Sequence, residues 1–103
     1  MNIAQTILEQ LGGRRFLVMT GAKKLIAHEN GLSMRLPGNM CKQRINYLKI
    51  VLDPSDTYTM EFGRVWGMTY KIIETISDVY CDMLQDIFTS KTGMETNLGT
   101  MGK

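Results

Sequence analysis

The chain has 103 residues, of which 44% are hydrophobic and 21% charged, and its formal net charge is +2. This length accommodates one domain with one core, and the balance of apolar and charged residues excludes wholesale disorder. No apolar run approaches the roughly 20 residues of a membrane-spanning helix, and the N-terminus lacks the basic segment of a signal peptide. We therefore expect a single domain at residues 1–93, a disordered tail at 94–103, a cytoplasmic location and no membrane contact.

Charge is distributed unevenly along the chain. Residues 14–49 carry eight basic residues against one acidic residue, a balance of +7, whereas residues 50–103 carry four basic against eight acidic residues, a balance of −4. Asymmetry of this kind between two halves of a chain is a reason to expect a charged partner.

The N-terminal part predicts one helix and one strand. Apolar residues at one-face spacing predict a short amphipathic helix over residues 2–11, and Gly12-Gly13 follows where helices commonly end. Residues 15–20 are short and continuously apolar, and we interpret them as a buried strand.

An Asn-Gly pair at residues 30–31 predicts the first hairpin, because both residue types tolerate positive φ. The strands on either side would be residues 24–28 and 32–36. The polar, basic segment 37–43 then reads as a loop.

A second hairpin follows at residues 45–52 and 57–66, in which apolar residues alternate with polar ones. Pro54, within the connecting Asp53-Pro54-Ser55-Asp56, suits the second position of a type I turn. Each strand would offer one apolar row to a covering layer.

The C-terminal part ends in a predicted helix. Residues 68–77 fit either a strand or a helix, and their β-branched residues favour a strand that ends near Ser77. An apolar stripe predicts a helix over residues 78–90, with Ser77 or Asp78 as its N-cap and Gly93 after its end. Together these elements predict an α+β fold, in which an antiparallel sheet of about five strands packs against an N-terminal and a C-terminal helix.

No constellation of catalytic residues is recognisable in the sequence. The single histidine, His28, has no visible connection to Cys41 or Cys81, and two cysteines with one distant histidine make a poor zinc site. The glycines follow neither the Walker loop nor the dinucleotide fingerprint. We expect a protein that is not an enzyme and has no catalytic, cofactor-binding or metal site.

Asp78, Asp82 and Asp86 recur every four residues, so on the predicted helix they would share one face. A solvated face that keeps the protein soluble is the ordinary explanation. The alternative is a strip of carboxylates that binds a basic groove in competition with nucleic acid.

A basic patch for a phosphate backbone is the rival candidate site. It would consist of Arg14, Arg15, Lys23, Lys24 and Arg44, with Phe16 and Tyr47 nearby.

Several segments of the chain resemble a family of small proteins found in phages, prophages and other mobile elements. They are residues 11–16 (LGGRRF), 19–23 (MTGAK), 45–47 (INY), 49–50 (KI), Tyr58 with 60–64 (MEFGR), 78–80 (DVY), 84–85 (LQ), 87–89 (IFT) and 92–93 (TG). The family is similar to the type II-A anti-CRISPR proteins from gut bacterial DNA, which inhibit Cas9-type nucleases.

The resemblance implies a non-enzymatic inhibitor that binds a type II CRISPR effector nuclease, or its guide or target nucleic acid. It carries over no defined binding residue, so Asp78, Asp82 and Asp86 are our candidate contact. The alternative function is a nucleic-acid-binding phage accessory protein that uses the basic segment 14–49. We favour a monomer.

Overall fold

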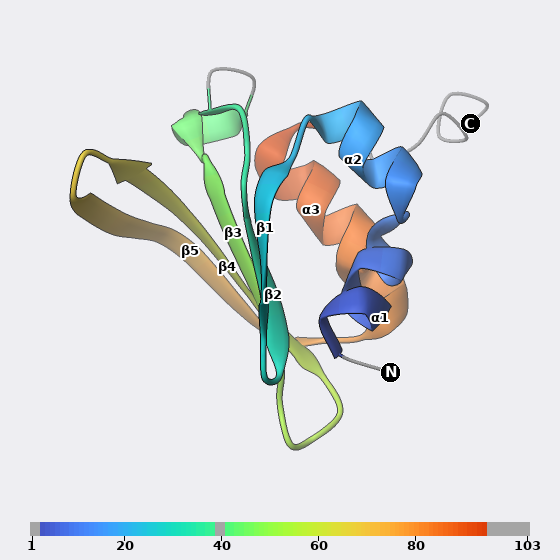
Figure 1. The fold of residues 1–103 in the computed structure, drawn as a ribbon. Coiled ribbons are helices and arrows are strands. Elements are labelled where there is room, and N and C mark those ends of the chain that lie inside the picture. The colour runs from blue at the N-terminus through green and yellow to red at the C-terminus, as the bar shows by residue number, and fades with distance from the viewer. Residues whose placement is uncertain (1–2, 39–40, 95–103) are drawn as a thin grey trace.

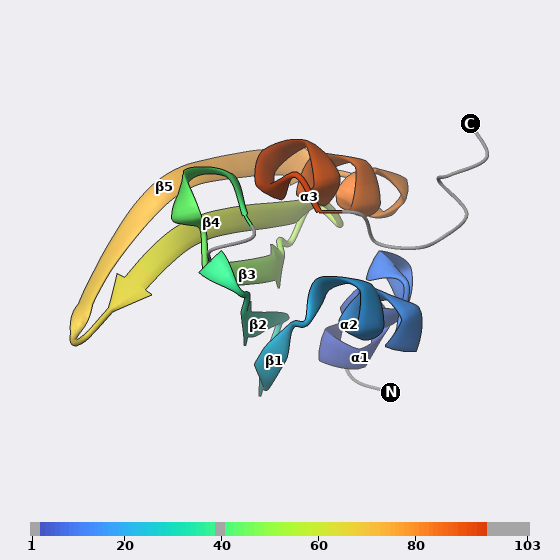
Figure 2. The same ribbon diagram turned by 90° about the horizontal axis from the view of Figure 1, so that it is seen from above.

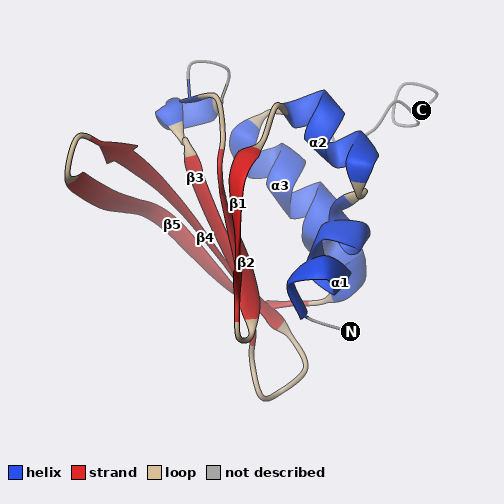
Figure 3. Ribbon diagram, viewed as in Figure 1, coloured by secondary structure: helices blue, strands red, loops and turns tan. Residues whose placement is uncertain are grey.

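The computed structural model describes residues 3–38 and 41–94. Its elements follow in the order α1 (Ile3–Leu11), α2 (Arg14–Thr20), β1 (Lys23–His28), β2 (Gly31–Arg35), the 3-10 helix η2 (Lys42–Arg44), β3 (Tyr47–Leu52), β4 (Tyr58–Trp66), β5 (Thr69–Val79), the 3-10 helix η3 (Cys81–Met83) and α3 (Leu84–Thr92). The strands form one antiparallel sheet in the order β1-β2-β3-β4-β5. The three α-helices lie on one side of that sheet (Figure 1 and Figure 3). The predicted α+β fold is therefore confirmed.

The core lies between the helices and the apolar rows that the strand pattern predicts. In one row Met34, Leu48 and Phe62 are partners across β2, β3 and β4, and each is at most 1% exposed. The helices bury their own aromatic residues against this layer, and the rings of Phe16 and Phe88 meet edge to face at 5.1 Å. Removal of this apolar surface from water is the main stabilising term of the fold.

Residues 14–20 form the helix α2, so the prediction of a buried strand at 15–20 is wrong. Phe16 and Thr20, one helical turn apart, are buried, whereas Val18 between them is 73% exposed. The Thr20 hydroxyl donates to the Phe16 carbonyl at 2.7 Å, and Gly21 ends the helix with φ of 72°. A short apolar run cannot separate a strand from one buried helical turn, and here the helical packing prevails.

Both predicted hairpins are present, but the first turn is one residue shorter than expected. His28 pairs with Gly31, so the two turn residues are Glu29 and Asn30, and neither has positive φ. Gly31 serves another purpose, because a Cβ there would lie 2.3 Å from the Ile50 carbonyl oxygen. Glycine at this position lets β2 approach β3 closely.

The segment predicted as the beginning of the C-terminal helix is strand instead. β5 continues to Val79, which pairs with Tyr58 and is fully buried, and α3 begins only at Leu84. Neither Ser77 nor Asp78 caps the helix, because cross-strand pairing and burial override local propensity here. The predicted end is correct, since Gly93 has φ of 81° and donates to the Thr89 carbonyl at 2.8 Å.

Met94 is the first residue of the predicted tail, and the structure describes it. Met94 is 7% exposed and accepts a hydrogen bond from the Cys41 thiol, with an Sγ–Sδ distance of 3.1 Å. The rest of that predicted tail, residues 95–103, lies outside the described residues. None of the helices in the described part of the chain is long and apolar enough to cross a membrane.

Candidate functional site

One face of the sheet is not covered by the α-helices, which all pack on the other side (Figure 2). We call it the open face. Strand pairing places Lys23 opposite Arg35, Arg35 opposite Tyr47, and Tyr47 opposite Gly63. Partners in an antiparallel sheet project to the same side, so two cations and an aromatic ring form one row across this face.

Tyr70 of β5 completes the row. A Cβ on Gly63 would lie 2.5 Å from Cε1 of Tyr70, so the ring lies directly over the glycine. The Tyr47 and Tyr70 rings meet edge to face with their centroids 5.3 Å apart. Tyr70 is 41% exposed, and its ring therefore offers solvent an aromatic surface that is supported from below.

The Tyr70 hydroxyl is held by Glu61, to which it donates a hydrogen bond. Burial raises the pKa of Tyr70, and the hydrogen bond and negative charge of Glu61 raise it further. The phenol is thus neutral at physiological pH. Lys49 is the strand partner of Glu61, so a positive charge lies next to this carboxylate in the sheet.

Arg35 has a nitrogen atom without a partner. Its Nε is buried and makes no hydrogen bond to any residue that the structure describes. A buried donor that is unpaired costs free energy, and such groups are rare in folded proteins.

The five basic residues of the predicted patch lie in three different places. Arg14 and Arg15 begin α2, on the helical side of the sheet, and Arg14 borders a hollow beside Glu9 of α1. Lys23 is on the open face, while Lys24 with φ of 55° lies where the β1–β2 pairing is irregular. The fifth residue, Arg44, belongs to η2. Phe16, expected as a stacking residue, is fully buried and is not available to a ligand.

The three aspartates of the predicted strip do not share one helix. Asp78 is in β5 with φ of 59°, Asp82 is in η3, and Asp86 is in the first turn of α3. The structure thus corrects the predicted helical row, because the chain is extended as far as Val79. All three aspartates are nevertheless exposed.

Residues with reactive side chains are held in structural contacts. The His28 Nε2 is 2.9 Å from the Ser33 hydroxyl, across the first hairpin. Burial raises the pKa of the Cys41 thiol to about 11, which disfavours the nucleophilic thiolate. Among the residues that the structure describes, no three possible metal ligands come together.

Sequence reasoning missed Tyr70 and did not single out Arg35. The sequence could have pointed to the former, because Tyr70 and Ile72 are apolar residues at alternate positions of the strand predicted over residues 68–77. Which cations join these residues depends on strand register, which is a property of the fold.

Comparisons with protein-family models, curated proteins and solved structures found no match to this chain.

Proposed function

We propose that this chain binds single-stranded nucleic acid through the open face of its sheet. The row of Lys23, Arg35, Tyr47 and Tyr70 supports this proposal, because it combines cations with an exposed ring. Nucleic-acid bases stack on such rings, and each stacked base contributes on the order of 1–3 kcal/mol. The cations would contact phosphate groups on either side of the stacked base.

An unpaired strand suits this face better than a duplex. In a duplex the faces of the bases are already stacked on each other and are inaccessible to a protein ring. The Tyr70 ring lies over Gly63 and presents its surface outward, which is an arrangement for stacking rather than for reading a groove.

The observation that carries the proposal is the position of Arg35. It is next to Tyr47 in register, and its buried Nε lacks a hydrogen-bond acceptor within the described chain. The terminal guanidinium nitrogens of Arg35 would bind a phosphate while the neighbouring base stacks on the aromatic pair.

Fluorescence anisotropy of a labelled 12-nucleotide single-stranded oligonucleotide tests the proposal. We expect Tyr70→Ala to weaken binding roughly 5- to 150-fold, the loss of about 1–3 kcal/mol, and Arg35→Gln to weaken it and reduce its salt dependence. Arg14→Gln is the matched control, because Arg14 lies on the helical side, and it should bind as the unchanged protein does. Equal affinity of all three variants, in folded protein, would refute the open face as the binding surface.

A second candidate function follows from the sequence resemblance, namely inhibition of a type II-A RNA-guided DNA nuclease. The feature that favours it is the junction between β5 and α3, where Asp78, Asp82 and Asp86 are exposed together with Tyr80, at 60%, and Met83, at 39%. Carboxylates beside exposed apolar side chains suit a basic protein surface, and the nucleic-acid channel of such nucleases is positively charged.

A DNA cleavage assay with a type II nuclease tests this second candidate, with the chain added before or after the guide RNA. The double variant Asp82→Lys, Asp86→Lys should relieve inhibition, whereas Glu29→Lys in the first hairpin turn should not. A cleavage rate that the unsubstituted chain does not change would refute the proposed inhibition. Full inhibition by the folded double variant would refute the aspartates as the binding site.

A further inference from the structure

The β4–β5 hairpin extends beyond the rest of the sheet as an arm, residues 64–73. β3 pairs with β4 only as far as Gly63, and the β4–β5 pairing shifts register between Phe62 and Gly63. Beyond this point the two strands continue alone and curve away from the helices (Figure 1 and Figure 2). The arm ends in a tight turn at Gly67 and Met68.

A groove runs between the arm and η2. It comprises a hollow of about 500 Å³ and an adjoining one of about 470 Å³, both of which Arg64 borders. The first is lined by Gln43, Arg64, Trp66, Lys71, Ile72 and Ile73, and the second by Gly38, Cys41, Arg44, Asn46 and Arg64. We call the two hollows together the arm groove. Each has the size of a small-molecule site, about 300–1,000 Å³.

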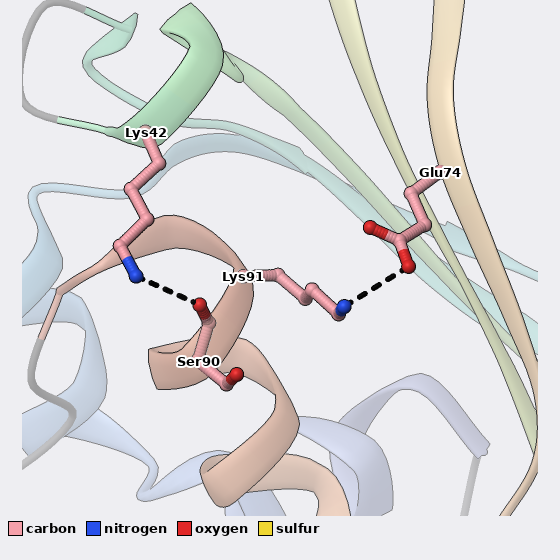
Figure 4. A network of polar contacts seen from close by, with 4 residues as sticks. All are labelled: Lys42, Glu74, Ser90 and Lys91. Carbon is pink, nitrogen blue, oxygen red and sulfur yellow. Dashed lines mark hydrogen bonds and ion pairs between the residues drawn. The ribbon is translucent and has the colours of Figure 1, made fainter.

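The charge of the arm groove is of one sign. Arg44, Arg64 and Lys71 contribute three cations, and none of the described residues that line the groove is acidic. The nearby carboxylate of Glu74 is engaged elsewhere, since it forms an ion pair with Lys91 at 3.0 Å (Figure 4). The groove is therefore complementary to an anion.

Trp66 supplies an aromatic surface in the same groove. The Arg64 guanidinium lies over the indole ring, 5.0 Å from the ring centroid, and Trp66 is 45% exposed. Cation–π contact fixes the ring while much of it stays accessible. If a planar base stacked on Trp66, a phosphate attached to that base's nucleotide would lie close to the positive charge of Arg64.

Both walls of the groove are connected to the same end of α3. Lys42 of η2 donates to the Ser90 carbonyl at 3.2 Å, and Lys91 joins α3 to Glu74 of β5 (Figure 4). Gln43 and Arg44 have φ of 55° and 57°, which is uncommon for residues other than glycine and is typical of functional sites. The groove is thus positioned by the fold before any ligand binds.

We propose that the arm groove binds one unpaired nucleotide of a single-stranded nucleic acid, with its base on Trp66 and its phosphate among Arg44, Arg64 and Lys71. Arg64 and Trp66 alternate along β4 with Gly63, so they lie on the opposite side of the arm from Tyr70. The site is therefore distinct from the open face, and it does not depend on binding there.

Trp66 is the only tryptophan of the chain, so its fluorescence reports on this groove alone. The probe is a 5′-phosphorylated tetradeoxyadenylate, titrated into the unchanged protein and into Tyr70→Ala. We expect saturable quenching in both proteins, because the groove does not require Tyr70. The double variant Arg44→Gln, Lys71→Gln should raise the midpoint at least about tenfold, whereas Lys49→Gln on the open face should leave it unchanged.

Three results would overturn the inference. They are emission that does not change with the oligonucleotide, a midpoint that is the same in the double variant as in the unchanged protein, and equal quenching by an abasic tetramer with the same phosphates. Quenching could persist in Tyr70→Ala while the anisotropy experiment shows equal oligonucleotide affinity for the open-face variants and the control. That result would support the arm groove and reject only the open face.

Discussion

The side chain of Asn46 pairs with the backbone of Val65 as an additional residue of β3 would. Its Nδ2 donates to the Val65 carbonyl at 2.8 Å, and the Val65 N–H donates to its Oδ1 at 2.7 Å. These two bonds lie just before the first residue of β3, Tyr47, and at the start of the arm. The arm is therefore anchored by a side chain at the point where it loses its neighbouring strand.

Replacement of Asn46 should loosen the arm. Asn46→Ala leaves the Val65 N–H and carbonyl without their partners, and we expect the free energy of unfolding to fall by about 1–3 kcal/mol. Urea denaturation measures this change. Asn30→Ala, in the exposed first hairpin turn, is the matched control, and a loss of the same size there would contradict the anchoring role.

Gly63 should be needed for the placement of Tyr70. In Gly63→Ala the new Cβ would meet the Tyr70 ring at 2.5 Å, so the ring must move. We expect oligonucleotide binding to weaken about as much as in Tyr70→Ala, and the two substitutions together to add little to either alone. Additive losses in this double-mutant cycle would show that Gly63 acts independently of the ring.

Stability at high pH should depend on Tyr70. Its pKa is raised in the folded protein by burial and by Glu61, so the fold favours the neutral phenol. This contribution is fully present below pH about 10, the ordinary pKa of tyrosine, and is lost as the pH rises towards the folded value. Urea denaturation between pH 9 and 11 should show a steeper decline for the unchanged protein than for Tyr70→Phe, and parallel curves would disagree with this assignment.

The two cysteines should differ in reactivity. Burial raises the pKa of Cys41 to about 11, whereas Cys81 is exposed in η3. At pH 8 a thiol reagent should label Cys81 quickly and Cys41 slowly, because the thiolate is the reactive form. Cys81→Ser should abolish the fast phase and Cys41→Ser should preserve it. If Cys41→Ser abolished the fast phase instead, Cys41 would be the accessible thiol, and this prediction would be contradicted.

The helical character of residues 14–20 predicts unequal costs of truncation. Phe16→Ala should lower the free energy of unfolding by about 3–5 kcal/mol, since the side chain is fully buried. Val18→Ala should change it by less than about 0.5 kcal/mol, because Val18 is exposed. A strand would place both side chains on one face, so similar large losses in chemical denaturation would support a strand instead.

The sheet could be predicted from sequence because its signals are local. The turn containing Pro54 and the alternation of Leu48 and Ile50 with polar residues identify a hairpin with one buried face, and the structure has that hairpin. The end of the last helix was equally readable, because Gly93 supplies the left-handed conformation that ends it.

The errors occur where tertiary packing decides between two possible local structures. The apolar segment with Phe16 satisfies either a strand or one helical turn, and the helix prevails because Phe16 meets Phe88. The stripe that includes Val79 fits a helix, but pairing with Tyr58 keeps this residue in β5. The acidic row of Asp78, Asp82 and Asp86 fails for this reason.

The candidate site was the least predictable part. Lys23, Arg35 and Tyr47 are separated by about a dozen residues each, and only the strand pairing makes them neighbours. Tyr70 joins them because Gly63 leaves room for its ring. The spacing of these residues in the sequence does not predict that they are neighbours, because their contact depends on the strand register.

Backbone NMR of the labelled protein, with and without a single-stranded oligonucleotide, tests the open face most directly. We predict that amide shifts change along the row from Lys23 to Tyr70, and that those of α1 and α2 stay in place. Shifts that change on the helices while the open-face row is unaffected, or no change at all at low salt, would contradict it.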